Sequence, residues 1–205
     1  MRERGRPGGL RRILIATGLL LPAACSPPMM AIDAVAVTGN AFRQERGLAG
    51  TADDLRIRVE INDAWLREDL AMFRLVNLAV YEGRVLLTGW VRYAATREEA
   101  VRLARDVDGV REVIDEIKVQ EAPQHTGNAR DNLIVSQLRT ALLLDTTVRS
   151  SNYLLDCVDG TVYLLGVARN RIELDRVFAH IQTLPYVRAV VSHVQLRDDP
   201  ARIQS

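Results

Sequence analysis

Metal binding and nucleophilic catalysis depend mainly on histidine, cysteine and acidic side chains held close together. In this sequence the histidines are His125, His180 and His193, and the cysteines are Cys25 and Cys157. They form no cluster at metal-ligand spacing, and no nucleophile can be paired with a base. We therefore predict no catalytic site, no metal site and no cofactor, and we expect neither an enzyme nor a small-molecule substrate.

Cys25 is the residue whose surroundings predict a covalent modification. Five arginines and one glutamate lie in residues 1–24, an apolar run covers Ile13 to Leu21, and the small residues Ala23 and Ala24 precede the cysteine. A basic head, an apolar stretch of about 7–15 residues and small residues before a cut are typical of a secretory signal. We predict a signal peptide over residues 1–24.

Two alternatives follow for Cys25. The segment Ala23-Ala24-Cys25 resembles the lipobox of bacterial lipoproteins, with Pro22 standing where a leucine is expected. That resemblance implies acylation of Cys25, palmitate included, and residues 25–52 would then be a tether between the anchor and the folded part. Three acyl chains hold a protein on a membrane far more firmly than one. Ordinary cleavage after Ala24 would instead leave a free cysteine.

The charge of the remaining chain argues against nucleic acid as the main partner. The whole sequence has a formal charge of +1. Five arginines and one glutamate give residues 1–24 a charge of +4, which leaves −3 for the rest. Binding to a phosphate backbone requires a basic field, which a slightly acidic body does not provide.

One motif is written twice in the rest of the chain. The heptapeptide GRVLLTG at 83–89 returns as GTVYLLG at 160–166, an offset of 77 residues. The same offset pairs Asp54 with Asp131, Ala64 with Ala141, Leu66 with Leu143, and Val110 with Val187. One register that persists without insertion over roughly 65 residues indicates a tandem duplication.

Each copy is expected to fold in the order helix, strand, strand, helix, strand. In the first copy, apolar residues recur every three or four positions after a cap at Asp53 or Asp54, which predicts the first helix. Alternating apolar residues on either side of Glu82-Gly83 predict a β-hairpin. Gly83 and Gly89 are expected at turn and strand-end positions, where backbone freedom is useful.

The predicted fold class is α+β, with two tandem modules that each pack a three-stranded mixed sheet against two helices. The expected ranges are 53–120 and 131–197 for the modules, 121–130 for a linker and 198–205 for a C-terminal tail. A module of about 65 residues buries barely enough surface to fold alone, so the two are expected to pack on one another. Cys157 matches Val80 in the repeat, so we expect it in the core.

The Gly-x-Val-x-Leu-x-Gly hairpin at 83–89, Ala100 and the Gly109–Val113 segment resemble the BON domain of bacterial envelope proteins. The second copy departs from this pattern with Val177 in place of the alanine and Tyr186 in place of the glycine. Two such domains behind a lipoprotein signal are typical of certain outer-membrane lipoproteins. The resemblance implies a non-enzymatic protein, lipid-anchored in the outer membrane and facing the periplasm, that binds anionic phospholipid and helps maintain outer-membrane integrity.

The same resemblance implies a lipid-binding surface on the first helix of the second copy, at 131–140. Leu133 stands where those lipoproteins carry a tryptophan. The candidate phospholipid-binding residues are Leu133, Ile134, Gln137 and Arg139. A leucine could insert into the membrane surface, although less favourably than an indole, and an arginine could attract a phosphate.

Two alternatives stay open at this point. The first concerns further cations of the second copy, which favour an anionic-lipid patch: Arg149, Arg169, Arg171 and Arg176. Because Lys118 is the only lysine of the sequence, a codon preference for arginine explains these residues equally well. The alternative function is a soluble periplasmic protein-interaction module that supports envelope assembly or a stress response, with other envelope proteins as partners.

Overall fold

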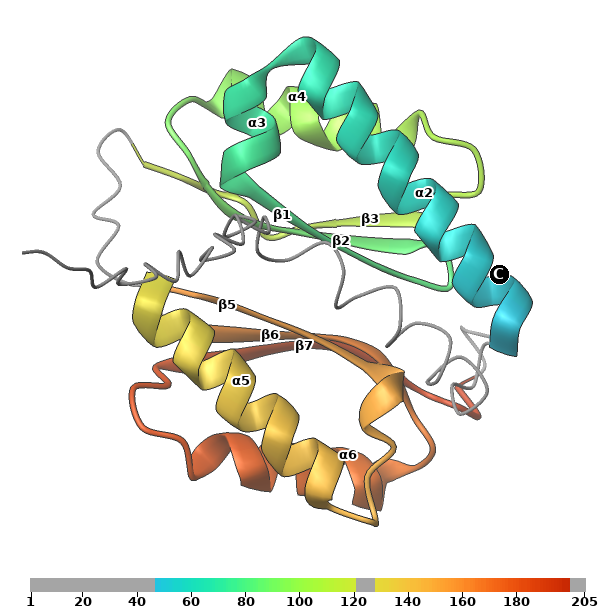
Figure 1. Cartoon of the computed structure of the whole chain (residues 1–205), viewed down its shortest axis with the longest axis vertical. Helices are drawn as coiled ribbons and strands as arrows, with labels where there is room; N and C mark the ends of the chain where they lie inside the picture. Colours follow the sequence, from blue (N-terminus) through green and yellow to red (C-terminus); the bar gives the residue numbers. More distant parts are fainter. Residues whose placement is uncertain (1–46, 121–127, 200–205) are drawn as a thin grey trace, which may run out of the picture.

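The computed structural model describes residues 47–120 and 128–199 (Figure 1). The predicted signal peptide, Cys25 and His125 lie outside the described residues. Two sheets face one another at the centre, and helices cover their outer sides, so the layers run helix, sheet, sheet, helix. The predicted α+β fold of two tandem modules is confirmed.

Module 1 is a mixed sheet covered by three helices. In chain order its elements are α2 (Gly47–Glu68), α3 (Leu70–Leu75), β1 (Val76–Tyr81), β2 (Arg84–Val91), α4 (Ala94–Arg105), β3 (Glu112–Asp115) and β4 (Lys118–Val119). Strands β1 and β2 form the antiparallel hairpin, and β3 and β4 both run parallel to β2.

Module 2 repeats this arrangement. Its elements are α5 (Asn128–Leu144), the short 3-10 helix η1 (Ser150–Asn152), β5 (Tyr153–Val158), β6 (Thr161–Ala168), α6 (Arg171–Gln182) and β7 (Ala189–Leu196). The hairpin β5–β6 is antiparallel, and β7 runs parallel to β6 over its whole length. The sheet order is therefore β5-β6-β7, and the middle strand β6 pairs with both of the others.

The elements differ from the sequence-based prediction in four places. Helix α2 begins at Gly47, inside the predicted tether, and α5 begins at Asn128, inside the predicted linker. Helix α3 was not expected; the Asp69 carboxylate starts it by accepting the Ala71 N–H at 2.8 Å. The last strand of module 1 is divided into β3 and β4 at Glu116 and Ile117, where Asp115 Oδ1 accepts the Ile117 N–H at 3.1 Å.

An aspartate in each first helix ties that helix to the hairpin of its own module. The Asp54 carboxylate accepts the N–H groups of Glu82 and Gly83, both at 2.9 Å. Asp131 does the same for Asp159 and Gly160, at 2.9 and 2.8 Å. The prediction that Asp53 or Asp54 caps the first helix was wrong, because the helix already begins at Gly47 and the buried Asp54 carboxylate accepts the turn amides instead.

The middle strands are buried on both faces. In β6, Val162 and Leu164 point toward α5 and α6, while Tyr163 and Leu165 point toward module 1. Each sheet therefore has one core of its own and contributes to a third core between the modules. Members of that third core come from both sheets: Tyr81, Leu86, Ile114, Val158, Tyr163, Leu165 and Val167.

Polar contacts surround the core between the sheets. Asn77 Nδ2 donates to Asp156 Oδ2 at 3.0 Å, and the Thr88 hydroxyl bonds to the same carboxylate. Across the interface, His193 Nε2 and Glu116 Oε1 are 2.9 Å apart. Glu116 and His193 occupy the same position in the two copies, offset by 77, so the modules meet much as the subunits of a twofold-symmetric dimer do.

Candidate functional site

The predicted lipid-binding residues lie on α5, which covers the sheet of module 2. Ile134 is only 1% exposed and packs in the module core, so it is not available to a lipid and is removed from the candidate set. Leu133 is 44% exposed, and Gln137 and Arg139 also lie on the outer side. Three of the four candidates are thus exposed on α5, with Leu133 and Gln137 in one row and Arg139 to the side of it.

One row of side chains runs along the outer side of α5. Leu133, Gln137, Thr140 and Leu144 follow one another at intervals of four, three and four, so they lie one above another on the helix. All four are exposed. Leu143, which is 69% exposed, lies beside the C-terminal end of this row. The surface is therefore apolar at both ends and uncharged in the middle.

The equivalent row of α2 has the opposite character. Its members, at the same positions in the repeat, are Arg56, Glu60, Asp63 and Arg67. Arg56 pairs with Glu60 at 2.9 Å, and Arg67 pairs with Asp63. Two ion pairs thus cover the outer face of the first helix in module 1, whereas leucine, glutamine and threonine replace them in module 2.

Arg139 places a positive charge beside this uncharged row. It is exposed, and within residues 47–120 and 128–199 no carboxylate forms an ion pair with it. The other arginines of the second copy do not extend its field, because most are neutralised by neighbours: Arg169 by Glu173 at 2.6 Å, Arg171 by Asp175 at 2.9 Å and Arg176 by Asp145 at 2.7 Å. Of the two explanations left open for these arginines, a broad cationic patch is not favoured by these ion pairs.

Asp145 belongs to a local polar cluster at the end of α5. Hydrogen bonds from Arg176, Thr147 and His180 hold the pKa of its carboxyl well below the ordinary value. Such a carboxylate stays ionised and anchors the helix end to α6. His180, one of the three histidines considered for chemistry, is thereby engaged in a structural contact.

Cys157 lies in the core, as the repeat predicted. Burial, together with the nearby Asp131 carboxylate, raises the pKa of its thiol to about 12. The thiol is therefore protonated at neutral pH, which is the inert state of a cysteine.

Two further observations concern the described residues as a whole. Within them, no group of three or more His, Cys, Asp or Glu side chains is placed to hold a metal ion. None of their helices combines the length and the apolar character needed to cross a membrane.

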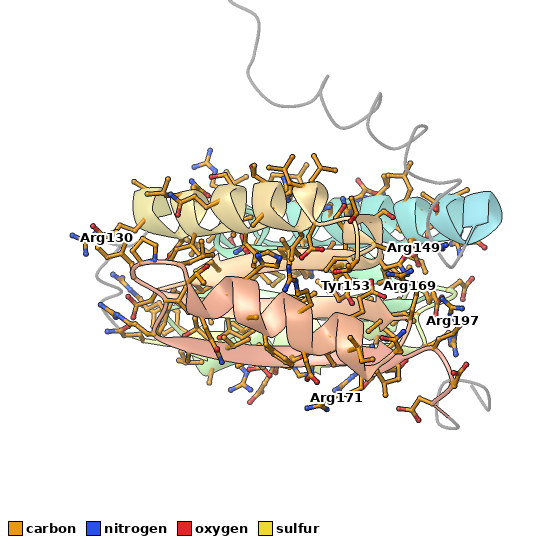
Figure 2. All side chains as sticks on the ribbon, turned by 90° about the horizontal axis from the view of Figure 1, so that it is seen from below. Arg130, Arg149, Tyr153, Arg169, Arg171 and Arg197 are labelled. Atoms are coloured by element: carbon orange, nitrogen blue, oxygen red, sulfur yellow. The ribbon has the colours of Figure 1, made fainter. Side chains whose placement is uncertain are left out.

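Sequence reasoning did not assign a role to a pair of residues at the start of α5. The Arg130 guanidinium lies over the ring of Tyr186, 5.5 Å from its centroid. Figure 2 shows Arg130 at one end of module 2, while Arg149 and Arg169 lie at the other end. The signal available in the sequence was the replacement of a glycine by Tyr186, which was noted there only as a departure from the repeat.

Comparison with known proteins agrees with the fold. The model of the BON domain matches residues 53–121 and 130–198. An uncharacterised protein encoded in the gshII 5′ region of Anaplasma centrale is 32% identical over 151 residues, which are 73% of this chain and 99% of that protein.

Two named relatives are also similar. The osmotically-inducible protein Y of Escherichia coli is 27% identical over 147 residues, 71% of this chain and 73% of that protein. The outer membrane lipoprotein DolP of Haemophilus influenzae is 32% identical over 91 residues, 44% of this chain and 47% of that protein. Because the family model covers well over half of the sequence, in two copies, the chain belongs to the BON domain family.

Proposed function

We propose that this protein is a non-enzymatic lipoprotein of the bacterial outer membrane, facing the periplasm, whose second BON module binds anionic phospholipid through the outer surface of α5. Acyl chains on Cys25 would hold the chain at the membrane, and α5 would add a second contact. Two weak attachments on one molecule bind much more strongly together than either alone. The biological role would be to help maintain outer-membrane integrity.

The observation that carries this proposal is the difference between the two equivalent helices. On α2 the four exposed residues of this row form two ion pairs. On α5 the same row consists of Leu133, Gln137, Thr140 and Leu144. A membrane interface accepts exposed leucines and repels carboxylates when its lipids are anionic. The outer surface of α5 carries the leucines and the unpaired Arg139, and it lacks carboxylates.

The relatives support an envelope location. One is an outer membrane lipoprotein by name, and this chain carries two BON domains. The similarity to that lipoprotein covers less than half of either chain, so the lipid-binding role rests on the surface of α5 rather than on the relative.

Leu143→Asp is expected to weaken binding to phosphatidylglycerol vesicles at least tenfold, because a leucine side chain leaves the interface and a carboxylate enters a negative surface potential. The measurement is vesicle flotation of the mature chain with Cys25 replaced by alanine, so that acylation does not contribute. Folding is checked by the denaturation midpoint, which should not move for an exposed position.

Leu66→Asp is the matched control for this experiment. Leu66 occupies the same place in α2 that Leu143 occupies in α5, and it is 50% exposed. The same change of residue should leave vesicle binding within about twofold of the unchanged protein, since α2 is not the proposed contact. Equal losses for both variants would show a nonspecific charge effect and would contradict the proposal.

Cys25→Ala is expected to release the protein from the membrane fraction of cells, because the α5 contact alone is weak. Mass spectrometry of the unchanged mature protein should show an acylated N-terminal cysteine. An unmodified chain that begins at Cys25 and remains in the periplasmic fraction would remove the anchored form of the proposal.

A second candidate function is a protein-interaction module of the periplasm. A groove of about 580 Å³ between the modules favours it, with Val59, Phe73, Leu78 and Leu155 among its apolar lining residues. On this alternative the purified protein ignores phosphatidylglycerol vesicles at both low and high salt.

A further inference from the structure

The start of α5 meets the loop between α6 and β7 at one corner of module 2, and this corner differs from its counterpart in module 1. There Arg56 donates to the Asp108 carbonyl at 2.9 Å and pairs with Glu60 at 2.9 Å. A Cβ atom on Gly109 would lie 2.9 Å from Arg56 Nη2, so that glycine leaves room for the guanidinium. In module 1 this corner is therefore occupied by the Arg56–Glu60 ion pair, which lies against a glycine without a side chain.

All four of these positions change together in the second copy. Arg56, Glu60, Asp108 and Gly109 correspond to Leu133, Gln137, Pro185 and Tyr186. The arginine that occupied the space is gone, and an aromatic side chain stands where a Cβ atom would have crowded the Arg56 guanidinium. Leu133 is exposed and lies three residues after Arg130 on α5, so the two side chains are neighbours on the helix surface.

Tyr186 occupies its position at a conformational cost. Its φ is +70°, in the left-handed region where module 1 uses Gly109 at +88°. A bulky side chain is rarely found there, and such outliers concentrate at binding sites. Tyr186 nevertheless remains 60% exposed, so little of the ring is buried in return. Packing within the protein therefore does not explain the tyrosine.

The charged groups of the corner leave one cation available. Asp131 accepts the Asp159 and Gly160 N–H groups, and the Asp159 carboxylate pairs with Arg188 at 2.9 Å. Arg130 is held over the Tyr186 ring, and no ion pair with a carboxylate is formed by it among the described residues. An exposed ring with a cation on its face presents an apolar surface and a positive charge side by side.

We propose that Tyr186 and Arg130 form the aromatic headgroup-binding site of module 2, in which the Tyr186 ring and Leu133 enter the membrane interface and Arg130 takes the phosphate of an anionic phospholipid. Tyrosine is favoured at the depth of the headgroups, and a basic residue beside it matches their charge. Tyr186 thereby supplies, from the α6–β7 loop, the aromatic group that α5 lacks. This inference rests on the proposed function.

Tyr186→Gly tests the inference because it separates binding from folding. We expect about tenfold weaker flotation with phosphatidylglycerol vesicles. The reason is that roughly 60 Å² of apolar ring surface would no longer be transferred from water into the membrane interface. The denaturation midpoint should stay the same or rise, because glycine relieves the unfavourable φ. Tyr186→Phe, which keeps the ring, should bind within about twofold of the unchanged protein.

Arg130→Gln tests the charge. Binding to phosphatidylglycerol should fall about fivefold at low salt, and the difference from the unchanged protein should shrink at high salt, where the contact is screened. Binding to phosphatidylcholine vesicles should not respond to this change. An equal loss on both lipids would overturn the assignment of Arg130.

The outcomes distinguish this inference from the proposed function. If Leu143→Asp weakens vesicle binding and Tyr186→Gly does not, α5 binds lipid and the aromatic site is overturned. If the unchanged protein does not float with phosphatidylglycerol vesicles, the proposed function fails and the site fails with it. A loss for Tyr186→Gly with an unchanged denaturation midpoint supports the site.

Discussion

Replacing Leu165 with aspartate is expected to lower the free energy of unfolding by about 3–5 kcal/mol, because an unpaired carboxylate would be buried between the two sheets. Leu165 has no exposed surface and belongs to the core shared by both modules. The effect should therefore reach module 1, although Leu165 lies in module 2.

Tryptophan fluorescence measures this effect directly. Both tryptophans, Trp65 and Trp90, belong to module 1, and Trp65 is fully buried there. In urea unfolding, Leu165→Asp should move the fluorescence transition and the circular dichroism transition together to lower concentration. A fluorescence transition that stays in place would show that module 1 does not depend on the interface.

Leu144→Asp is the control for this prediction. It makes the same chemical change in the same module, at a residue that is 75% exposed on α5. Surface substitutions of this kind usually change the free energy of unfolding by no more than about 0.5 kcal/mol. The contrast between the two variants isolates burial between the sheets from the addition of a charge.

Gly166→Ala is the second change for which a large effect is expected. The η1 helix crosses β6 so closely that a Cβ on Gly166 would lie 1.9 Å from the Asn152 carbonyl oxygen. The backbone of Gly166 also has a φ of +148°, which only glycine adopts readily. Steric displacement and backbone strain together should cost about 4 kcal/mol of the free energy of unfolding.

The same substitution within a helix should have the opposite sign. Gly50→Ala lies within α2, where alanine favours the helix by up to about 1 kcal/mol. Gly89, the counterpart of Gly166, has its Cβ position 2.2 Å from the Leu75 carbonyl oxygen, so Gly89→Ala should behave like Gly166→Ala. Thermal or urea unfolding of the three variants tests the prediction, and a stable Gly166→Ala would contradict the close crossing.

These glycines show where reading the sequence was partly right. Gly83 and Gly160 were expected at turns, and both have positive φ in their hairpins. Gly89 was expected at a strand end, but it lies inside β2, as its counterpart Gly166 lies inside β6. Each is required because the carbonyl oxygen of the last residue of the preceding helical turn, Leu75 or Asn152, lies over it. Local residue patterns carry no information about such an approach.

The candidate site was predicted in part for a similar reason. Helical spacing places Leu133 and Gln137 on one row of α5, but the same segment also included Ile134, which faces the core. Which of several arginines stays unpaired depends on where carboxylates from other elements lie, as with Arg176 and Asp145. Tyr186 meets Arg130 only because α6 returns the chain to the start of α5.

The sequence by itself determined the duplication, the order of elements, the hairpins and the burial of Cys157, because periodicity and repeat register record which side of an element is apolar. Only the tertiary structure decided what those apolar sides pack against. Leu86 and Leu165 alternate with the residues of their own module cores, yet they meet across the chain between two sheets. Burial leaves a local pattern in the sequence, whereas the partner of a buried or exposed side chain is set by contacts between distant segments.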